Sequence, residues 1–246
     1  MFLGLTSWFA EAHEPALFPA PRVRTDVLMD LHMDEDYGWR FTSGDWGRAG
    51  GNVQSVLFAG SALHALAARA AWVWEYMLAG QRLVDYGCAM GDGSAALAAA
   101  LPQLSITGCD WSPAAVALAQ QRWPTLTFLV DDIRTPTQDA HVIWTSHTLE
   151  HLADPAAAVE ALRARCHLLV ALFPPITTPQ TTGPHVGAPS LASWSREVET
   201  PLFVTQFSTL RRDPECAGSL LEEPSLLCVW RGTHPSRAVR ARLVPA

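Results

Sequence analysis

An acid followed by small residues at alternate positions is the first pattern in this chain that could do chemistry. Asp85 ends a short apolar run, and Gly87, Ala89 and Gly91 follow it at every second position. Small residues in a turn between a strand and a helix let the backbone approach a ligand closely. Nucleotide-type cofactors bind at such turns in doubly wound sheets. The pattern therefore predicts a cofactor site at this turn, which also contains Cys88.

The spacing of the small residues bears on which cofactor binds. A dinucleotide turn of the Gly-x-Gly-x-x-Gly type would need glycines at positions 87, 89 and 92. The chain has Gly87, Ala89 and Asp92 there, so the second and third glycines are missing. This mismatch disfavours a nucleotide-dependent oxidoreductase, which is kept as an alternative.

Two later apolar runs also end in acids. Asp110 ends one run and is followed by Trp111, while Asp131 and Asp132 end another. A carboxylate after the second strand can accept both hydroxyls of a ribose, and a bulky neighbour can pack on adenine. The structural alternatives are that Asp110 caps the helix beginning near Ser112 and that the other two acids lie in a plain loop.

Taken together, these stretches resemble the class I S-adenosylmethionine-dependent methyltransferases. The resemblance covers residues 80–173 well, is weaker to the end and is absent in the first 50 residues. It implies S-adenosylmethionine as the cofactor, with Asp132 accepting from the exocyclic amine of adenine and Asp131 as the second candidate. The chain departs from the family at Ala89, where glycine is usual, and this constrains the backbone angles of the turn. The resemblance implies ten cofactor-binding residues: Asp85, Gly87, Cys88, Ala89, Gly91, Asp110, Trp111, Asp132, Ile133 and Ser146.

Two histidines follow the fourth expected strand, where the methyl acceptor should lie. His147 or His151 could act as a general base if the acceptor must lose a proton. The alternative for His151 and Glu150 is that they brace the loop. These three residues also have His-x-x-Glu-His spacing, to which His185 could add a fourth metal ligand. However, the helix start at Asp154 makes residues 147–153 a loop or a single turn, so we expect no metal.

Short strands and helices alternate around these residues. We expect an α/β fold, a doubly wound, seven-stranded, mostly parallel sheet with helices on both faces and an antiparallel hairpin at its C-terminal edge. A helix over residues 52–78, with a break at Gly60, should precede the sheet. The expected strands are 82–86, 105–110, 126–130, 141–146, 166–173, 202–210 and 225–231. Helices are expected at 93–101, from 112, at 155–164 and at 191–199.

The chain divides into three parts on this basis. Residues 1–50 form an irregular N-terminal extension, rich in aromatics, that could be a lid or part of a substrate pocket, or could simply pack on the domain. Residues 51–232 form the S-adenosylmethionine-binding domain, in which the loop 174–190 should cover the acceptor. Residues 233–246 form a C-terminal tail.

Composition excludes several classes of function. The net charge of −7 offers no basic stripe for nucleic acid, and all 17 basic residues are arginine, which excludes a catalytic lysine. Five dispersed cysteines indicate reduced thiols in a cytoplasmic protein. The longest apolar stretch, residues 53–79, is interrupted by charged residues, so we expect no membrane span.

The sequence therefore predicts a methyltransferase that acts on an oxygen or nitrogen of a small metabolite by in-line displacement. A non-catalytic, methyltransferase-like scaffold protein is an alternative of another class. The identity of the acceptor and the oligomeric state do not follow from the sequence.

Overall fold

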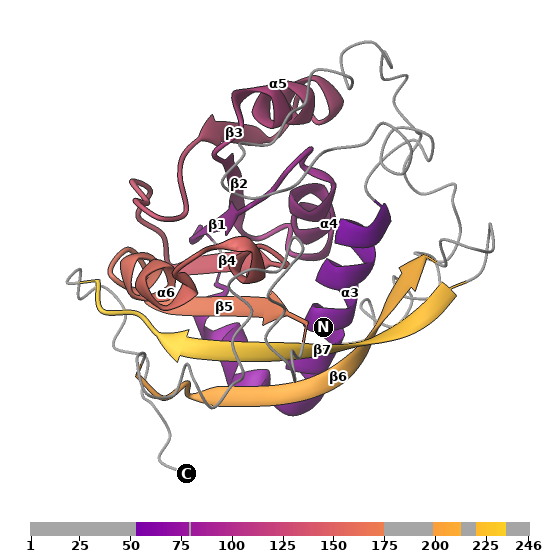
Figure 1. Ribbon diagram of the computed structural model, residues 1–246, viewed down its shortest axis with the longest axis vertical. Helices are drawn as coiled ribbons and strands as arrows, with labels where there is room; N and C mark the ends of the chain where they lie inside the picture. Colours follow the sequence, from indigo (N-terminus) through magenta and orange to yellow (C-terminus); the bar gives the residue numbers. More distant parts are fainter. Residues whose placement is uncertain (1–52, 79, 175–198, 213–219, 235–246) are drawn as a thin grey trace.

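Seven strands form one sheet in the order β3-β2-β1-β4-β5-β7-β6 (Figure 1). The computed structural model describes residues 53–78, 80–174, 199–212 and 220–234. Four expected parts lie outside these ranges: the extension, the loop after Pro174, nearly all of the helix at 191–199, and the C-terminal tail after His234. The strands are β1 (Arg82–Tyr86), β2 (Ser105–Asp110), β3 (Thr127–Val130), β4 (Val142–Ser146), β5 (Leu168–Phe173), β6 (Phe203–Arg212) and β7 (Leu220–Arg231).

Strands β1 to β5 are parallel, and β7 pairs antiparallel with both β5 and β6. The expected doubly wound sheet with an antiparallel edge hairpin is thus confirmed. β7 begins at Leu220, five positions before the expected start, because Pro224 does not end it. The register places Pro224 opposite Ser208 of β6, whereas β5 pairs only with residues from Leu226 onward. A proline is tolerated in a strand where no neighbour needs its missing N–H.

Helices cover both faces of the sheet (Figure 1). Alternate residues of the fully buried β5 pack on opposite faces, one set with α3 and α4 and the other with α6. Ser112 caps α5 and Asp154 caps α6, since each side chain accepts a hydrogen bond from a backbone amide three residues on. The helices are α3 (Val53–Arg69), η2 (Ala71–Tyr76), α4 (Asp92–Ala100), α5 (Pro113–Arg122), η3 (Leu149–His151) and α6 (Pro155–Arg163).

The expected break at Gly60 is wrong, because α3 continues through this residue to Arg69. Ala59, Ala62 and Leu63 on either side are buried, and packing of this apolar surface outweighs the weak helix propensity of one glycine. Among the described helices, none combines the length and the apolar character that a membrane span requires.

The parallel strands end together at one edge of the sheet. Tyr86 of β1 lies beside Cys109 of β2 and Thr145 of β4, and Asp110 lies beside Val130 of β3. The strand order reverses between β1 and β4, and ligands of doubly wound sheets bind at the carboxyl ends of the strands beside such a reversal. The turns after β1, β2, β3 and β4 therefore converge on one place.

Candidate active site

The turn between β1 and α4 has three residues in the left-handed backbone region. Their φ angles are +80° for Gly87, +48° for Ala89 and +82° for Gly91. The turn is fixed to β2, because the amides of Gly87 and Cys88 both donate to the carbonyl of Cys109, at 2.8 and 3.1 Å. An alanine adopts this region at some cost, so Ala89 carries backbone strain in the middle of the turn.

Close packing also requires small residues in this turn. A Cβ on Gly87 would lie 2.1 Å from Oγ1 of Thr148, and one on Gly91 would lie 2.6 Å from the ring of Phe128. The Cys88 side chain leaves the turn and packs in a buried cluster that includes Phe128. Burial raises the pKa of the Cys88 thiol well above its usual range. This thiol is therefore a neutral packing group.

Two buried carboxylates flank the turn. Oδ2 of Asp85 accepts a hydrogen bond from Ser94 Oγ at 2.6 Å. In Asp110, Oδ2 accepts from the amide of Ala89 at 2.9 Å and Oδ1 accepts from the amide of Ser112 at 3.0 Å. Burial raises the pKa of Asp85 to about 6, against the lowering effect of Ser94 and with a further increase from the nearby charge of Asp110. Burial likewise raises the pKa of Asp110, although its two backbone hydrogen bonds oppose the change.

The two adjacent acids after β3 have different surroundings. Asp131 is buried, and its Oδ2 accepts from Tyr86 Oη at 2.7 Å and from the amide and hydroxyl of Thr137 at 3.0 Å each. Asp132 is partly exposed and pairs with the guanidinium of Arg134, at 2.6 Å between Oδ2 and Nη2. Burial alone would raise the pKa of Asp132, but its hydrogen bonds and ion pair with Arg134 lower it.

A second group of polar residues follows β4. His147 has a φ of +51°, and its ring stacks on Phe58 of α3 with the ring centroids 3.6 Å apart. Oε1 of the buried Glu150 lies 3.5 Å from His147 Nδ1 and 3.9 Å from His151 Nε2. Burial alone would raise the pKa of Glu150, but the hydrogen bond and charge of His147, together with the charge of His151, lower it. Glu150 is therefore a buried carboxylate shared by two histidines.

Several buried polar atoms in this group have no hydrogen-bond partner within the described part of the chain. They are Ser146 Oγ, His147 Nε2 and Glu150 Oε2. Buried polar atoms are rarely left unpaired in folded proteins, and exceptions concentrate at functional sites. The described residues form no cluster of metal-ligating side chains, and His185 lies outside them.

Comparison with known proteins identifies the family of this part of the chain. Residues 84–167, which span the glycine turn, both acid-bearing strand ends and the histidine segment, match the family described as methyltransferase domain. This region is a class I S-adenosylmethionine-dependent methyltransferase domain. S-adenosylmethionine is the cofactor of the family, which agrees with the resemblance found in the sequence.

Two curated relatives of the methyltransferase domain have the same name. Trans-aconitate 2-methyltransferase from Klebsiella pneumoniae is 41% identical over 76 residues, and that from Methylobacterium radiotolerans is 33% identical over 81 residues. Each alignment covers about a third of this chain, and the chain spans only 30% and 31% of the length of these two relatives.

Solved structures agree with the fold. One is a structure reported for the conversion of a disulfide bond into a thioacetal group during echinomycin biosynthesis. Its TM-score is 0.53 at 18% sequence identity, and the match covers 72% of this chain and 82% of that chain. Protein 1320 of Thermoplasma acidophilum has a TM-score of 0.51 and 12% identity, covering 71% and 85%. Likeness at these identities concerns the fold alone.

The methyltransferase domain brings most of the expected cofactor-binding residues to one edge of the sheet. Asp85, Gly87, Ala89, Gly91 and Asp110 surround the turn. Three others lie differently: the side chains of Cys88 and Ile133 are buried in apolar clusters, and Trp111 is half-buried against the cluster under α6. For Cys88 and Ile133, only the backbone is left to contact a cofactor.

Four residues of this edge were not expected from the sequence: Ser94, Phe58, Thr148 and Tyr86. Ser94 has a sequence signal, because a hydroxyl in the first turn of α4 follows the acid-glycine pattern. The stacking of Phe58 on His147 joins α3 to the end of β4 across 89 residues, and no local pattern predicts it.

Proposed function

We propose that this chain transfers the methyl group of S-adenosylmethionine to a hydroxyl oxygen of a small molecule. The observation that carries this proposal is the pair of buried carboxylates, Asp85 and Asp110, on either side of the glycine turn. Asp110 can accept from ribose hydroxyls, and the charge of Asp85 beside the glycine turn favours the positive charges of S-adenosylmethionine and would repel the pyrophosphate of a dinucleotide at that turn. When bound, S-adenosylmethionine supplies an activated methyl group and leaves as a neutral thioether.

We assign the proposed binding roles from the position of each residue along the carboxyl edge of the parallel strands. Asp110 accepts hydrogen bonds from the ribose hydroxyls, and Asp85 and the Gly87–Gly91 turn hold the amino-acid end. Asp132 and the amide of Ile133 recognise the adenine edge, and Trp111 packs near the adenine. Ser146 lines the boundary between cofactor and acceptor.

His147 is the proposed general base. Glu150 Oε1 lies 3.5 Å from Nδ1, which favours the tautomer with its proton on Nδ1 and leaves Nε2 free to accept a proton. The acceptor oxygen loses its proton to Nε2 and forms the new bond to carbon, while the carbon–sulfur bond breaks and sulfur keeps its electron pair. The stacked ring of Phe58 holds the imidazole plane. His151 is the second candidate for the base, because it shares Glu150.

A general base is useful only for an acceptor that carries a proton at neutral pH. A hydroxyl group fits this requirement, whereas a carboxylate has already lost its proton. The names of the curated relatives support a rival proposal, in which a carboxylate of a molecule like trans-aconitate is the acceptor. The N-terminal extension, as a proposed pocket segment, would contribute to the choice between them.

Transfer of isotope-labelled methyl groups separates the two acceptors. The assay would offer trans-aconitate and a set of small alcohols and phenols to the wild-type chain, His147→Asn and Glu150→Gln. We expect transfer to a hydroxyl compound, a loss of kcat of about 100-fold in His147→Asn, and unchanged affinity of that variant for S-adenosylhomocysteine.

Other outcomes would contradict parts of the proposal. Transfer to trans-aconitate that survives His147→Asn would favour the carboxylate acceptor. Binding of S-adenosylhomocysteine without transfer to any extract of metabolites would favour the scaffold alternative. His151→Asn, assayed in the same way, should keep most of the wild-type activity, and a loss confined to this variant would move the role of base to His151.

A further inference from the structure

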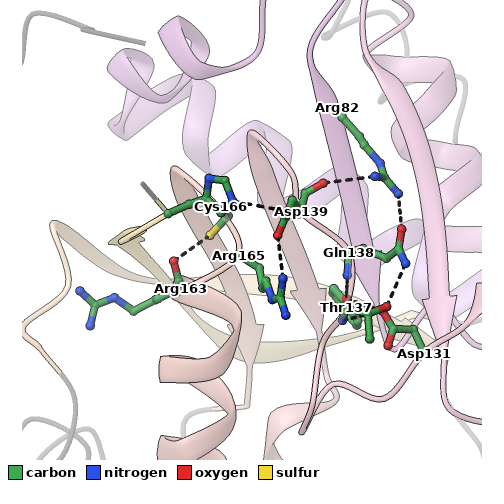
Figure 2. Close-up of polar contacts among 10 residues, drawn as sticks. Arg82, Asp131, Thr137, Gln138, Asp139, Arg163, Arg165 and Cys166 are labelled. Carbon is green, nitrogen blue, oxygen red and sulfur yellow. Dashed lines mark hydrogen bonds and ion pairs between the residues drawn. The ribbon is translucent and has the colours of Figure 1, made fainter. Parts of the chain in front are cut away.

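The crossover from β3 to β4 contains no helix. Residues 131–141 pass from the carboxyl end of β3 to the start of β4, across the two strands that lie between them in the sheet. Parallel strands are usually joined by a helix, which supplies its own backbone hydrogen bonds. Here a series of side-chain hydrogen bonds holds the crossover in place. Figure 2 shows this series, which runs from Asp131 through Thr137 and Gln138 to Arg82.

The chain of polar contacts starts at one carboxylate oxygen. Oδ2 of Asp131 accepts hydrogen bonds from Tyr86 Oη and from both donors of Thr137, all within 3.0 Å. Tyr86 Oη in turn accepts from the amide of Gln138 at 3.2 Å. Both Tyr86 and Asp131 are buried, so a lost donor here could not be replaced freely by water.

These contacts lie against the backbone that carries the proposed cofactor-binding groups. The amide of Asp131 donates to the carbonyl of Asp110 at 3.0 Å, which ties the ends of β2 and β3 together. Asp132 and Ile133 follow directly in the chain. Tyr86 belongs to β1 and comes immediately before Gly87. One phenol therefore links the strand that leads into the glycine turn to the segment proposed to recognise adenine.

We propose that Tyr86 and Asp131 are positioning residues that set how strictly the chain distinguishes adenine from other purines. The inference rests on the proposed function, because Asp132 and the amide of Ile133 are its proposed adenine contacts. The Tyr86 hydroxyl remains a donor at any physiological pH, since burial, followed by the hydrogen bond to Asp131, raises its pKa. Without the Tyr86 hydroxyl, Asp131 Oδ2 loses one of its three hydrogen-bond donors, and the loop 131–137 is held less firmly. The proposed contacts of Asp132 and Ile133 to the adenine edge then lose their alignment.

A comparison of two ligands isolates this role. S-adenosylhomocysteine carries the 6-amino group of adenine, whereas S-inosylhomocysteine carries an oxygen there and cannot donate to Asp132. Calorimetric titration of the wild-type chain should give a preference of at least tenfold for S-adenosylhomocysteine. In Tyr86→Phe, the affinity for S-adenosylhomocysteine should fall about tenfold and that for S-inosylhomocysteine less than twofold, so the preference largely disappears.

Two further variants distinguish the positioning role from a general loss of stability. Thr137→Val removes a hydroxyl donor to the same oxygen of Asp131 with little change of shape, and it should reduce the preference in the same direction. It also supplies the test if Tyr86→Phe does not fold. Tyr76→Phe removes a hydroxyl from a buried tyrosine in η2 and should keep the wild-type preference.

The outcomes separate the two proposals. Equal losses for both ligands in Tyr86→Phe and Thr137→Val, with the preference intact, would overturn the positioning role and leave the proposed function standing. A wild-type chain that binds neither ligand would overturn the proposed function and this inference with it.

Discussion

Asp85 is the residue at which stability and ligand binding conflict most directly. Its carboxylate is buried, it lies near Asp110, and burial raises its pKa to about 6. A raised pKa means that the folded chain holds the proton more tightly than the unfolded chain does. The contribution of Asp85 to stability is therefore greatest below pH 3.8 and is lost as the pH rises through about 6.

Asp85→Asn should consequently stabilise the free protein at neutral pH. The gain in the free energy of unfolding at pH 7.5 should be about 2–3 kcal/mol and should disappear near pH 4, because the wild-type carboxyl is then protonated. Urea unfolding at both pH values measures it, with Asp139→Asn, at an exposed acid, as the control. A gain of equal size at both pH values would show that the charge of Asp85 is not its cause.

At the scale of residues, the sequence predicted which acids lie at the ends of the strands, but not the residues that bind them. The acids Asp85 and Asp110 could be found because each ends an apolar run. The engagement of Asp131 by Tyr86 and Thr137, and of Asp132 by Arg134, could not be found, because both depend on the path of the loop between β3 and β4. At Ala89, where the chain departs from the family pattern, the backbone has a left-handed φ of +48°.

At the scale of elements, the glycine turn after β1 packs tightly against the segment after β4. Gly87 lies so close to Thr148 that a Cβ would overlap its side chain, at 2.1 Å from Oγ1. The hydroxyl of Thr148 donates back to the carbonyl of Ser146 at 3.1 Å, which holds it in this place. The proposed cofactor and acceptor segments are thus in direct contact, and a change in one should move the other.

Gly87→Ala tests this contact, and Gly80→Ala is its matched control. Both glycines have similar φ angles, +80° and +78°, but a Cβ on Gly80 would meet no atom within 4 Å. Gly80→Ala should reduce the free energy of unfolding by about 1 kcal/mol, the cost of the backbone angle alone. Gly87→Ala should reduce it by about 3 kcal/mol or more, since the overlap adds to that cost. Similar losses in thermal or urea unfolding would argue against a tight contact.

The elements themselves were largely predictable, since their apolar periodicity and caps are local. Two departures from the prediction, the continuation of α3 through Gly60 and the start of β7 at Leu220, arose where tertiary context overrides a local signal. Gly60 lies between buried helical neighbours, and Pro224 lies beyond the reach of β5. Neither condition can be read from the sequence.

At the scale of the whole molecule, a buried arginine joins helix α6 to the antiparallel strand β7. Arg163, at the end of α6, donates from Nε to the carbonyl of Arg231 at 2.8 Å and pairs with Glu160 and Glu199. Its side chain is 2% exposed, whereas that of Glu199 is 65% exposed. The guanidinium therefore anchors the end of β7 to α6.

Arg163→Met should loosen this junction. We expect a loss of about 2 kcal/mol in the free energy of unfolding and faster hydrogen exchange in β7, because a buried charged hydrogen bond is removed. Arg165→Met is the control, since Arg165 is 42% exposed and its pair with Asp139 should contribute about 0.5 kcal/mol or less. Equal effects of the two substitutions would show that Arg163 does not anchor β7.

Calorimetric titration with S-adenosylhomocysteine and with NAD tests the central claim most directly. The wild-type chain should bind one S-adenosylhomocysteine and no NAD, and Asp110→Asn should weaken that binding at least tenfold, because a charged acceptor for the ribose hydroxyls is lost. Asp139→Asn, before the amino end of β4, should bind like the wild type. Tight binding of NAD without S-adenosylhomocysteine, or an Asp110→Asn variant with wild-type affinity, would contradict the account.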